Sequence, residues 1–365
     1  MFALIRGAAT AALAVALLAA PAAADAAGHK HKKKAAPAVT VMTRNIYLGG
    51  NIFHPIGAPN LTEFERRAGE LWAEVQHTDF VGTRAKLIAR EIKRTKPDVI
   101  GLQEVATWRR GPDGVKDGAT TPSRTVVYDF LAALRKELKR AGLKYSVAGN
   151  KQEADIEAPI DAGYDVRLTM HDVILVKKSR DLKVTRKLSK NYETSIGVPT
   201  PAGTLTSTRG WAAIDATLKG KKFRFVVTHL ESAAEPTRTA QARELVSNSG
   251  PLRVRKPVIV VGDMNSDPEG RESDANAFNV LHGFGLIDTW PTIHKSDPGF
   301  SCCLKNSDLS DTDTSGFNHR IDLILTRPKL KGLSGVVVGK KLSDRAPNGL
   351  WPSDHAGVVE KLRLR

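Results

Sequence analysis

The segment from Val258 to Asn265 constrains the fold of this chain more than any other part of the sequence. It begins with four consecutive apolar residues, Val258–Val261, between a proline and a glycine. A short β-branched run with such boundaries predicts a buried β-strand rather than a helix. Asp263 and Asn265 follow at once, and alternate residues of an extended chain face the same side. The segment therefore predicts either two polar side chains in one site or an Asx turn that closes a core strand.

The same pattern, an apolar strand that ends in a polar residue, recurs along the chain. The polar residues in these positions are Asn45, Glu104, His229, Asp263, Asn265, Asp354 and His355, and Asp322 lies within a further strand. Each of them alone has an ordinary explanation as a salt-bridged strand end, because a lone buried carboxylate is costly. Together they predict one polar site at the rim of a sheet.

The residue types in this set indicate a particular chemistry. Carboxylate and amide oxygens are hard ligands that suit Mg²⁺, and also Mn²⁺ or Ca²⁺. Zinc would require more histidines or thiolates in tight spacing. Two histidines near carboxylates suit acid and base catalysis at neutral pH, and a metal with such a pair is what phosphoester hydrolysis needs. The sequence contains neither a Gly-x-Ser-x-Gly elbow nor a cysteine with a histidine close in sequence, so covalent Ser or Cys catalysis has no support.

Many short strands and few, dispersed helices predict an α/β fold of two mixed sheets packed face to face with outer helices. Helices are expected over 61–96, with a break near residues 77–83 and a capping box from Thr62 to Glu65, and over 128–141, 236–248 and 273–281. Loops are expected over Trp108–Ser123 and Glu153–Asp161. No linker divides residues 39–365, which are expected to form one domain.

The N-terminal part of the chain has the composition of an export signal. Residues 1–26 contain one arginine, an apolar run and small residues that fit a cleavage site, so they predict a signal peptide and a secreted protein. The apolar run is too short for a membrane anchor, and no transmembrane segment is expected in the mature chain. Residues 27–38 are rich in lysine and histidine and predict a basic disordered tail.

The net charge and the cysteines limit the possible classes of substrate and the possible redox states of the thiols. The formal net charge of +16 favours binding to a polyanion, which could be nucleic acid, anionic lipid or cell-wall polymer. The alternative is that the charge serves solubility alone. The two cysteines are adjacent, at Cys302 and Cys303. Their Cα separation lies below the usual disulfide range, so a vicinal disulfide would be strained, although export favours oxidation. Two free thiols under a loop are the alternative.

Five motifs in order resemble the endonuclease/exonuclease/phosphatase superfamily, which includes DNase I-like nucleases, neutral sphingomyelinases and inositol phosphatases. These motifs are Leu102–Val105, Thr228–Leu230, Gly262–Asn265, Arg320–Leu325 and Ser353–His355, and the resemblance extends from Val39 to Arg365. It implies a four-layered α/β sandwich and Mg²⁺-dependent phosphoester hydrolysis.

The resemblance also implies roles for single residues. Glu104 would be the main metal ligand, with Asn45 and Asp354 close to the metal. Asp263 would orient or activate water, and Asn265 would contact the phosphate. His355 would be oriented by Asp322 and His229 would face the scissile phosphate, and which histidine is acid or base stays open.

The chain departs from the family pattern in two places. The span from Asn45 to Glu104 is long, so an insertion is expected around residues 47–80. His171 and Asp172 stand where family members often have a Ser-Gly-Asn-like stretch, so His171 either contacts phosphate or is a surface histidine. Arg167 and Arg209 either bind a second phosphate or pair with acids, and pairing is favoured.

The sequence thus predicts a secreted, divalent-metal-dependent phosphodiester hydrolase, with nucleic acid as the first substrate because the chain is basic. A sphingomyelinase-type phospholipase is an alternative, and Ile52–Ile56 is its only apolar candidate for membrane contact. A phosphomonoesterase would need several basic residues around one pocket. A non-catalytic binding module on the same fold is the remaining alternative. No stable protein partner is expected.

Overall fold

The structure is a computed structural model that describes residues 36–114, 123–271 and 273–365. The signal peptide expected over 1–26 and most of the tail expected over 27–38 lie outside the described residues, and so does the middle of the expected loop at 108–123. Residues 36–365 form one compact unit. In the part of the chain that the structure describes, no helix has the length and apolar character needed to cross a membrane.

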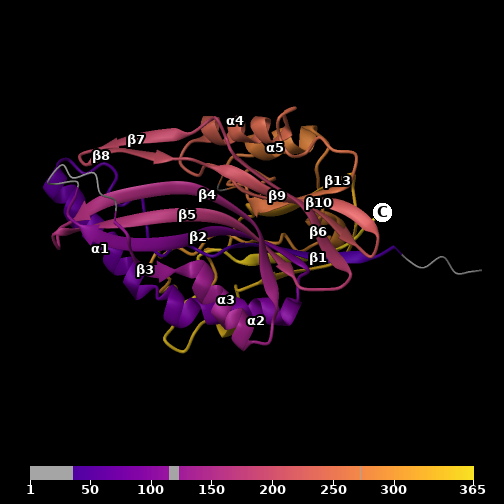
Figure 1. Ribbon diagram of the computed structural model, residues 1–365, viewed down its shortest axis with the longest axis horizontal. Helices are drawn as coiled ribbons and strands as arrows, with labels where there is room; N and C mark the ends of the chain where they lie inside the picture. The colour runs from indigo at the N-terminus through magenta and orange to yellow at the C-terminus, as the bar shows by residue number, and fades with distance from the viewer. Residues whose placement is uncertain (1–35, 115–122, 272) are drawn as a thin grey trace, which may run out of the picture. The chain divides into compact units, whose positions relative to one another are not determined.

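Two large mixed sheets form the centre of this unit (Figure 1). Sheet one has the order β14 (Lys331–Val338), β15 (Gly357–Arg363), β1 (Ala38–Asn45), β2 (Val99–Pro112), β5 (Tyr164–Lys177) and β4 (Tyr145–Ile160), with β3 (Thr125–Asp129) paired to β2. Sheet two has the order β12 (Ile287–Asp288), β13 (Asp322–Arg327), β11 (Val258–Asp263), β10 (Lys221–His229), β9 (Gly210–Leu218) and β6 (Leu182–Asn191). A separate hairpin consists of β7 (Ile196–Thr200) and β8 (Gly203–Ser207).

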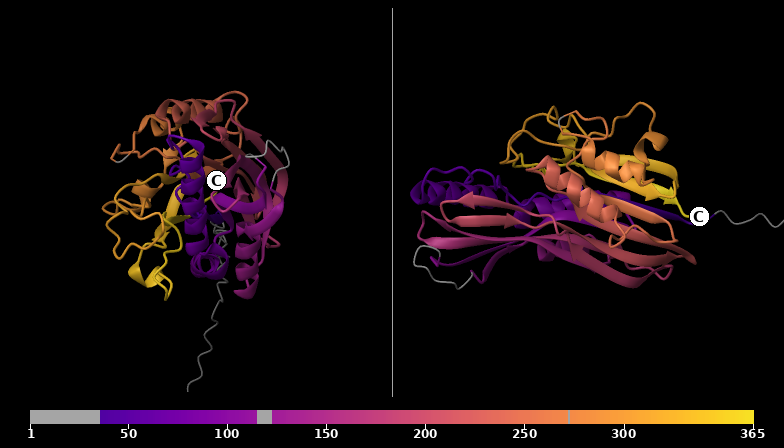
Figure 2. Two further views of the ribbon diagram at one scale, coloured as in Figure 1. Left: turned by 90° about the vertical axis from the view of Figure 1, so that its left-hand side faces the viewer. Right: turned by 90° about the horizontal axis from the view of Figure 1, so that it is seen from above.

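Helices cover the outer face of each sheet (Figures 1 and 2). The helices are α1 (Leu61–His77), α2 (Ala85–Thr95), α3 (Phe130–Arg140), α4 (Glu235–Val246), α5 (Asn276–Gly283) and α6 (Trp290–Ile293), with a π-helix η1 (Phe80–Arg84) and a 3₁₀-helix η2 (Leu342–Asp344). Helices α1, α2 and α3 share a core with sheet one, whereas α4 and α5 share a core with sheet two. The expected four-layered α/β sandwich is therefore confirmed.

The two sheets meet through a core of alternating strand residues. Val41 and Val99 of sheet one pack in the same cluster as Phe225 and Val261 of sheet two, and all four are fully buried. At Gly101 a Cβ atom would lie 2.5 Å from Val261 Cγ2, so only glycine allows the sheets to approach this closely here. This contact brings the ends of β1 and β2 close to the ends of β10 and β11.

Several local expectations are wrong, because tertiary pairing overrides local composition. Strand β2 continues to Pro112 and β4 to Ile160, where loops were expected, because both pair with β5 along these segments. The acidic residues of β4 are matched by a basic neighbour, as Asp155 pairs with Arg167 at 2.7 Å. The expected capping box at Thr62 is absent, and the side chain of Asn60 caps α1 instead.

A buried polar contact links the two sheets near their edges. Glu360 of β15 is 1% exposed and contacts Thr289 Oγ1, which follows β12. The same hydroxyl also bonds to the Ile324 carbonyl oxygen at 3.0 Å. Because a hydroxyl has one proton, this arrangement is satisfied when Glu360 is protonated and donates to Thr289. Burial accordingly raises the pKa of Glu360 to about 8.

We expect the substitution Glu360→Gln to make the protein more stable at high pH. Since the pKa is raised on folding, the stability contributed by Glu360 is complete below pH 4.5 and is lost as the pH rises through about 8. Glutamine cannot ionise, so its advantage should reach on the order of several kcal/mol by pH 9 and be small at pH 5. Urea unfolding at both pH values measures this, with the exposed Glu193→Gln as control. An equal shift at both pH values would contradict it.

Candidate active site

The strand order brings the ends of four strands to one cavity. β1 and β2 are parallel neighbours, with Asn45 opposite Gln103, and β10 and β11 are parallel neighbours, with His229 opposite Asp263. Antiparallel β13 adds Asp322 opposite Asp263. The cavity has a volume of ≈ 820 Å³. Of the residues expected in the site, Glu104, Arg209, His229, Asp263, Asn265, Asp354 and His355 line the cavity.

Glu104 and Asp354 form the acidic part of the cavity. Glu104 lies at an irregularity in the pairing of β2 with β5 and has a left-handed φ of 57°, so the bulge turns its side chain toward the cavity. It accepts hydrogen bonds from Leu48 N at 2.9 Å and Asn45 Nδ2 at 3.0 Å. Burial and the Glu104 carboxylate raise the pKa of Asp354 to about 6. Two crowded carboxylates of this kind fit the hard-oxygen donor set of a divalent cation.

Asn45 connects this acidic pair to the second sheet. Its amide nitrogen Nδ2 donates to Glu104 Oε1 at 3.0 Å and to Asp263 Oδ2 at 3.1 Å. Its oxygen Oδ1 accepts from Tyr47 N at 2.9 Å. The amide thus faces both carboxylates with its nitrogen, so Asn45 orients them.

Asp263 lies at the centre of the site. Its carboxylate oxygen Oδ2 lies 3.4 Å from His229 Nε2 and 3.7 Å from His355 Nε2. Its Oδ1 accepts from Asn265 N at 3.0 Å, which is the Asx turn considered from the sequence. The Asx turn and the placement of Asp263 and Asn265 in one site are therefore both present, because both residues line the cavity. Burial raises the pKa of Asp263 to about 7.

The glycine before Asp263 is required by the close approach of two strands. A Cβ atom at Gly262 would lie 1.9 Å from the carbonyl oxygen of Thr228, so any other residue would separate β10 from β11 at this point. The registry of His229 with Asp263 depends on this contact. The motif that the sequence presents as a turn is therefore also a packing requirement.

The two histidines have opposite electrostatic surroundings. His355 Nδ1 lies 2.9 Å from Asp322 Oδ2, which also accepts from Ser301 Oγ at 2.7 Å. Burial alone would lower the pKa of His355, but Asp322, Asp354 and Asp263 outweigh it and raise this pKa well above 6.5. For His229, burial and the nearby Arg209 lower the pKa well below 6.5.

Arg209 determines the protonation of His229. Arg209 Nη1 lies 2.8 Å from His229 Nδ1, and a guanidinium can only donate. His229 Nδ1 must therefore accept, which places the ring proton on Nε2, directed toward Asp263. Arg209 is itself held by ion pairs with Glu153 at 3.3 Å and Glu231 at 3.6 Å. The structure therefore contains the pairing of Arg209 with acidic residues that was favoured from the sequence. Arg209 also lines the cavity.

Four functional neighbours were not singled out from the sequence: Glu153, Glu231, Asp172 and Arg84. Glu153 and Asp172 lie within 4.8 Å of each other and of His229, and burial raises the pKa of both carboxyl groups. The sequence signals for Asp172 are its position directly before the apolar run Val173–Val176 and its place, with His171, where family members often have a Ser-Gly-Asn-like stretch. Glu153 lies in a segment that looks like an acidic loop, so it gives no such signal.

Two buried arginines fix the loops that surround the acidic pair. Arg84 of η1 donates to the carbonyl oxygens of Ile46 at 2.8 Å, Tyr47 at 3.2 Å and Pro352 at 3.3 Å. Arg44 of β1 forms a bidentate pair with Glu91 of α2 and also donates to the His355 carbonyl oxygen. The sequence signal for Arg44 is its position inside the first strand, next to Asn45.

The remaining expected residues lie around the cavity or away from it. The structure joins Cys302 and Cys303 as a vicinal disulfide, and both sulfur atoms lie 3.7 Å from His355 Nε2. Arg167 is paired with Asp155 and is absent from the described cavity lining. His171 contacts Asn150 Oδ1 at 2.8 Å within sheet one. The chemical roles of all expected site residues stay predictions, as does the insertion at 47–80.

Comparison with known proteins identifies the family. The model of the endonuclease/exonuclease/phosphatase family matches residues 75–355. The chain belongs to this family. Its members are phosphoester hydrolases and are typically dependent on a divalent metal. A search of curated proteins finds no match to the chain.

Solved structures of family members share the fold. A protein of this family from Leptotrichia buccalis is 16% identical, with a TM-score of 0.54 over 89% of this chain and 99% of the other. One from Beutenbergia cavernae is 19% identical, with a TM-score of 0.54 over 90% and 72%. A mannosyl-6-phosphatase from Bacteroides thetaiotaomicron is 18% identical, with a TM-score of 0.52 over 89% and 99%. At these identities the similarity shows the fold alone.

We expect Arg209→Gln to raise the pKa of His229. The substitution removes the cation that faces Nδ1, so protonation of this nitrogen becomes less unfavourable. A pH titration of the histidine ¹⁵N resonances measures the pKa and the tautomer directly. Arg167→Gln is the matched control, because this arginine is paired with Asp155 away from the cavity. A His229 pKa that does not move would show that Arg209 does not control this ring.

Proposed function

We propose that this protein is a divalent-metal-dependent phosphodiester hydrolase that acts outside the cell. The main support is the meeting of Glu104, Asp354, Asp263 and the His355–Asp322 pair in one cavity of a phosphoester hydrolase fold. Export is supported by the composition of residues 1–26.

Glu104 and Asp354 would hold the cation, either Mg²⁺ or the related Mn²⁺ or Ca²⁺. When bound there, the ion supplies positive charge to the phosphate oxygens. Asn45 keeps the Glu104 carboxylate in place, and Arg84 keeps the chain on both sides of the acidic pair in place. Side chains of the protein carry out the proton transfers and the other contacts to the phosphate.

His229 acts as a hydrogen-bond donor to the phosphate. Because its Nδ1 accepts from Arg209, the neutral ring carries its proton on Nε2 and cannot take a second proton there. A neutral N–H that faces the cavity can stabilise the charge that develops on a phosphate oxygen. This assigns to His229 a role in which no proton is transferred.

The proton transfers then belong to Asp263 and His355. The oxygen of a water molecule attacks phosphorus, and the proton of this water passes to the Asp263 carboxylate. As the ester P–O bond breaks, the leaving oxygen takes the proton from Nε2 of His355, whose positive charge is stabilised by Asp322. Transfer of the proton from Asp263 to His355 Nε2, 3.7 Å away, then restores both groups, and no further reactant is required. In this proposal Asp263 is the base and His355 is the acid.

The charges around the cavity support a diester rather than a monoester. Among the described residues that line it, the lysines and arginines are Arg209 and Lys305. Arg209 is already paired with Glu153 and Glu231, so few free cations face the dianion that a monoester would bring. The net charge of +16 alone favours nucleic acid as substrate, whereas an apolar cavity beside the site favours a lipid phosphodiester.

We expect the mature protein to hydrolyse bis(p-nitrophenyl) phosphate with Mg²⁺ and to lose this activity in EDTA. Asp263→Asn should lower kcat about 10²–10⁴-fold because it removes the base. His229→Ala should lower kcat about 10²-fold because it removes one donor to the phosphate. The control is His282→Ala, an exposed histidine of α5. A parent protein that is inactive with Mg²⁺, Mn²⁺ and Ca²⁺ would instead indicate the non-catalytic binding module.

The leaving group distinguishes the two histidines. With p-nitrophenolate, which leaves without protonation, His355→Ala should cost little beyond its effect on binding. With an alkoxide leaving group the same substitution should cost about 10²–10⁴-fold, because the proton donor is then essential. His229→Ala should have the same effect on both substrates. Equal losses for His355→Ala on both substrates would contradict its role as the acid.

A further inference from the structure

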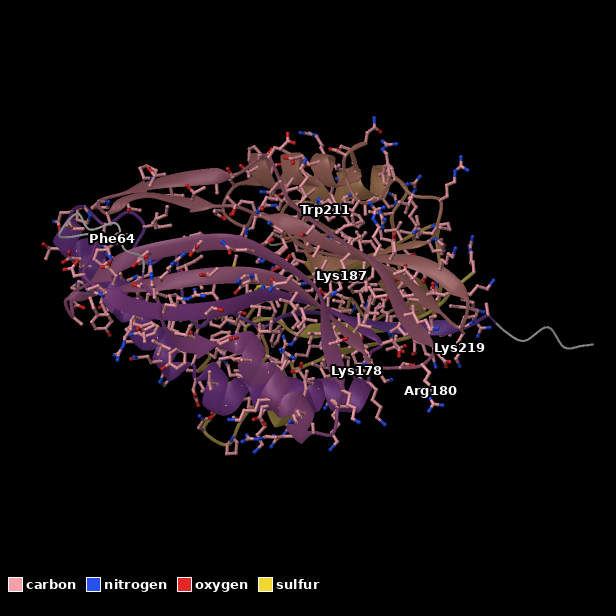
Figure 3. All side chains as sticks on the ribbon, in the orientation of Figure 1. Phe64, Lys178, Arg180, Lys187, Trp211 and Lys219 are labelled. Carbon is pink, nitrogen blue, oxygen red and sulfur yellow. A yellow bond between two sulfur atoms is a disulfide. The ribbon has the colours of Figure 1, made fainter. Side chains whose placement is uncertain are left out.

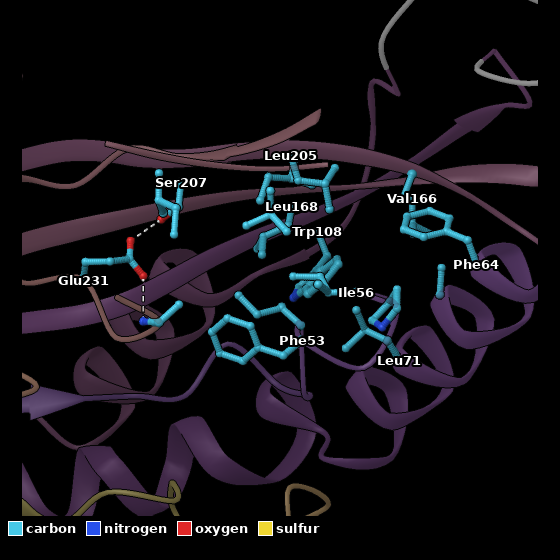
Figure 4. Close-up of a pocket in the computed structure, with 18 of the residues that line it drawn as sticks. Phe53, Ile56, Phe64, Leu71, Trp108, Val166, Leu168, Leu205, Ser207 and Glu231 are labelled. Carbon is cyan, nitrogen blue, oxygen red and sulfur yellow. Dashed lines mark hydrogen bonds between the residues drawn. The ribbon is translucent and has the colours of Figure 1, made fainter. Parts of the chain in front are cut away.

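A second, mainly apolar cavity lies beside the catalytic cavity. Figure 4 shows the residues that line it. Its walls come from residues 52–56, from α1, β2, β4 and β5, and from the β7–β8 hairpin. The side chains that define it are Phe64, Leu71, Trp108, Leu168, Val198 and Leu205.

The two cavities share part of their walls. Ile52, Phe53 and Arg209 line both of them. Phe53 is 46% exposed although it is a large apolar residue. A molecule with its phosphate next to Arg209 and His229 can therefore extend past Phe53 into the apolar cavity.

The carboxylate at one end of the apolar cavity already has hydrogen-bond partners. Glu231 accepts hydrogen bonds from Ser207 Oγ at 2.9 Å and Ala233 N at 3.0 Å, as Figure 4 shows. It is also ion-paired with Arg209. Apart from Ser207, Arg209 and Glu231, the described side chains of the wall are hydrocarbon or aromatic, so they offer few partners to the polar edge of a nucleobase, whose burial would be costly. A hydrocarbon chain has no such requirement.

The β7–β8 hairpin has the alternation expected of a cover over an apolar ligand. Ile196, Val198 and Leu205 line the cavity, whereas Thr204 and Thr206 are exposed on the other face. The hairpin pairs with no other strand among the described residues. An isolated hairpin needs a packed apolar face to be stable, and its inner face lies over the cavity.

Exposed basic residues occur far from both cavities. In Figure 3, Lys178, Arg180 and Lys219 lie together at the opposite end of the sheets from Phe64. The pairing agrees, because Val176 is opposite Val99, at the start of β2, and Lys221 starts β10. These charges thus lie at the strand ends away from Glu104 and His229, where they cannot hold a substrate phosphate.

We propose that the apolar cavity binds one hydrocarbon chain of the substrate, so that the substrate is a single-chain amphiphilic phosphodiester of the lysophospholipid type. The phosphate lies in the catalytic cavity and the chain passes between Phe53 and the β7–β8 hairpin. The inference rests on the proposed phosphodiester hydrolase function. It names the group esterified to the phosphate, which the catalytic residues do not determine.

The test is a series of p-nitrophenyl phosphodiesters with methyl, hexyl and decyl groups, and the thymidine 5′ ester, each below its critical micelle concentration. We expect kcat/KM to rise steeply from methyl to decyl, by up to about fourfold per methylene that enters the cavity. The decyl ester should exceed the thymidine ester. A flat series, or a preference for the thymidine ester, overturns the inference.

A blocked cavity provides the matched comparison. Val198→Trp should fill the cavity from the hairpin and lower kcat/KM for the decyl ester at least tenfold more than kcat/KM for the methyl ester. Thr206→Trp places the same side chain on the outer face of the hairpin and should change neither ester. Equal effects of the two substitutions on the decyl ester would contradict the assigned site.

A binding measurement separates this inference from the proposed function. Dodecylphosphocholine, below its critical micelle concentration and in EDTA, is titrated into the protein by calorimetry. We expect binding with a negative heat-capacity change that Val198→Trp weakens at least tenfold and Thr206→Trp does not. If the parent fails to cleave the methyl ester, the proposed function fails and this titration alone decides the inference. Absence of binding overturns it even where the methyl ester is cleaved.

Discussion

The hydrogen bonds of the Asn45 amide hold the two halves of the site together. This side chain lies at the end of β1 in sheet one and donates both to Glu104 of the same sheet and to Asp263 of the other. The contact requires the sheets to meet closely, which Gly101 permits, and β10 and β11 to stay in register, which Gly262 permits. Glu104 and Asp354 therefore share one cavity with Asp263 and the two histidines because the packing of the two sheets sets their separation.

Buried arginines support this arrangement at its edges. Arg84 bonds to backbone carbonyls on both sides of the cavity, and Arg44 joins β1 and α2 to the chain at His355. A buried arginine with its donors satisfied is a rigid fork, so it fixes several chain segments at once. Loops that carry Asp354 and His355 would otherwise be free to move relative to the strands, and catalysis depends on placement within fractions of an ångström.

The surroundings of the two histidines shift their pKa values in opposite directions. Asp322 favours a charged His355, whereas Arg209 keeps His229 neutral with its proton on Nε2. The same arginine lies between the catalytic cavity and the apolar cavity and is held there by Glu153 and Glu231. One residue thus determines the tautomer of His229 and forms part of the wall that the two cavities share.

The sequence by itself determined the fold class and the strand-end residues, because apolar runs and the polar residues that follow them are local patterns. Asn45, Glu104, His229, Asp263 and His355 were all found in this way. The extended strands β2 and β4 were missed, because their charged segments are stable only when paired with β5. The roles of Arg84, Glu153 and Glu231, and the apolar cavity, were decided by the tertiary structure alone. Their partners lie tens or hundreds of residues away in the chain, and no local pattern specifies which charges or apolar side chains meet across such distances.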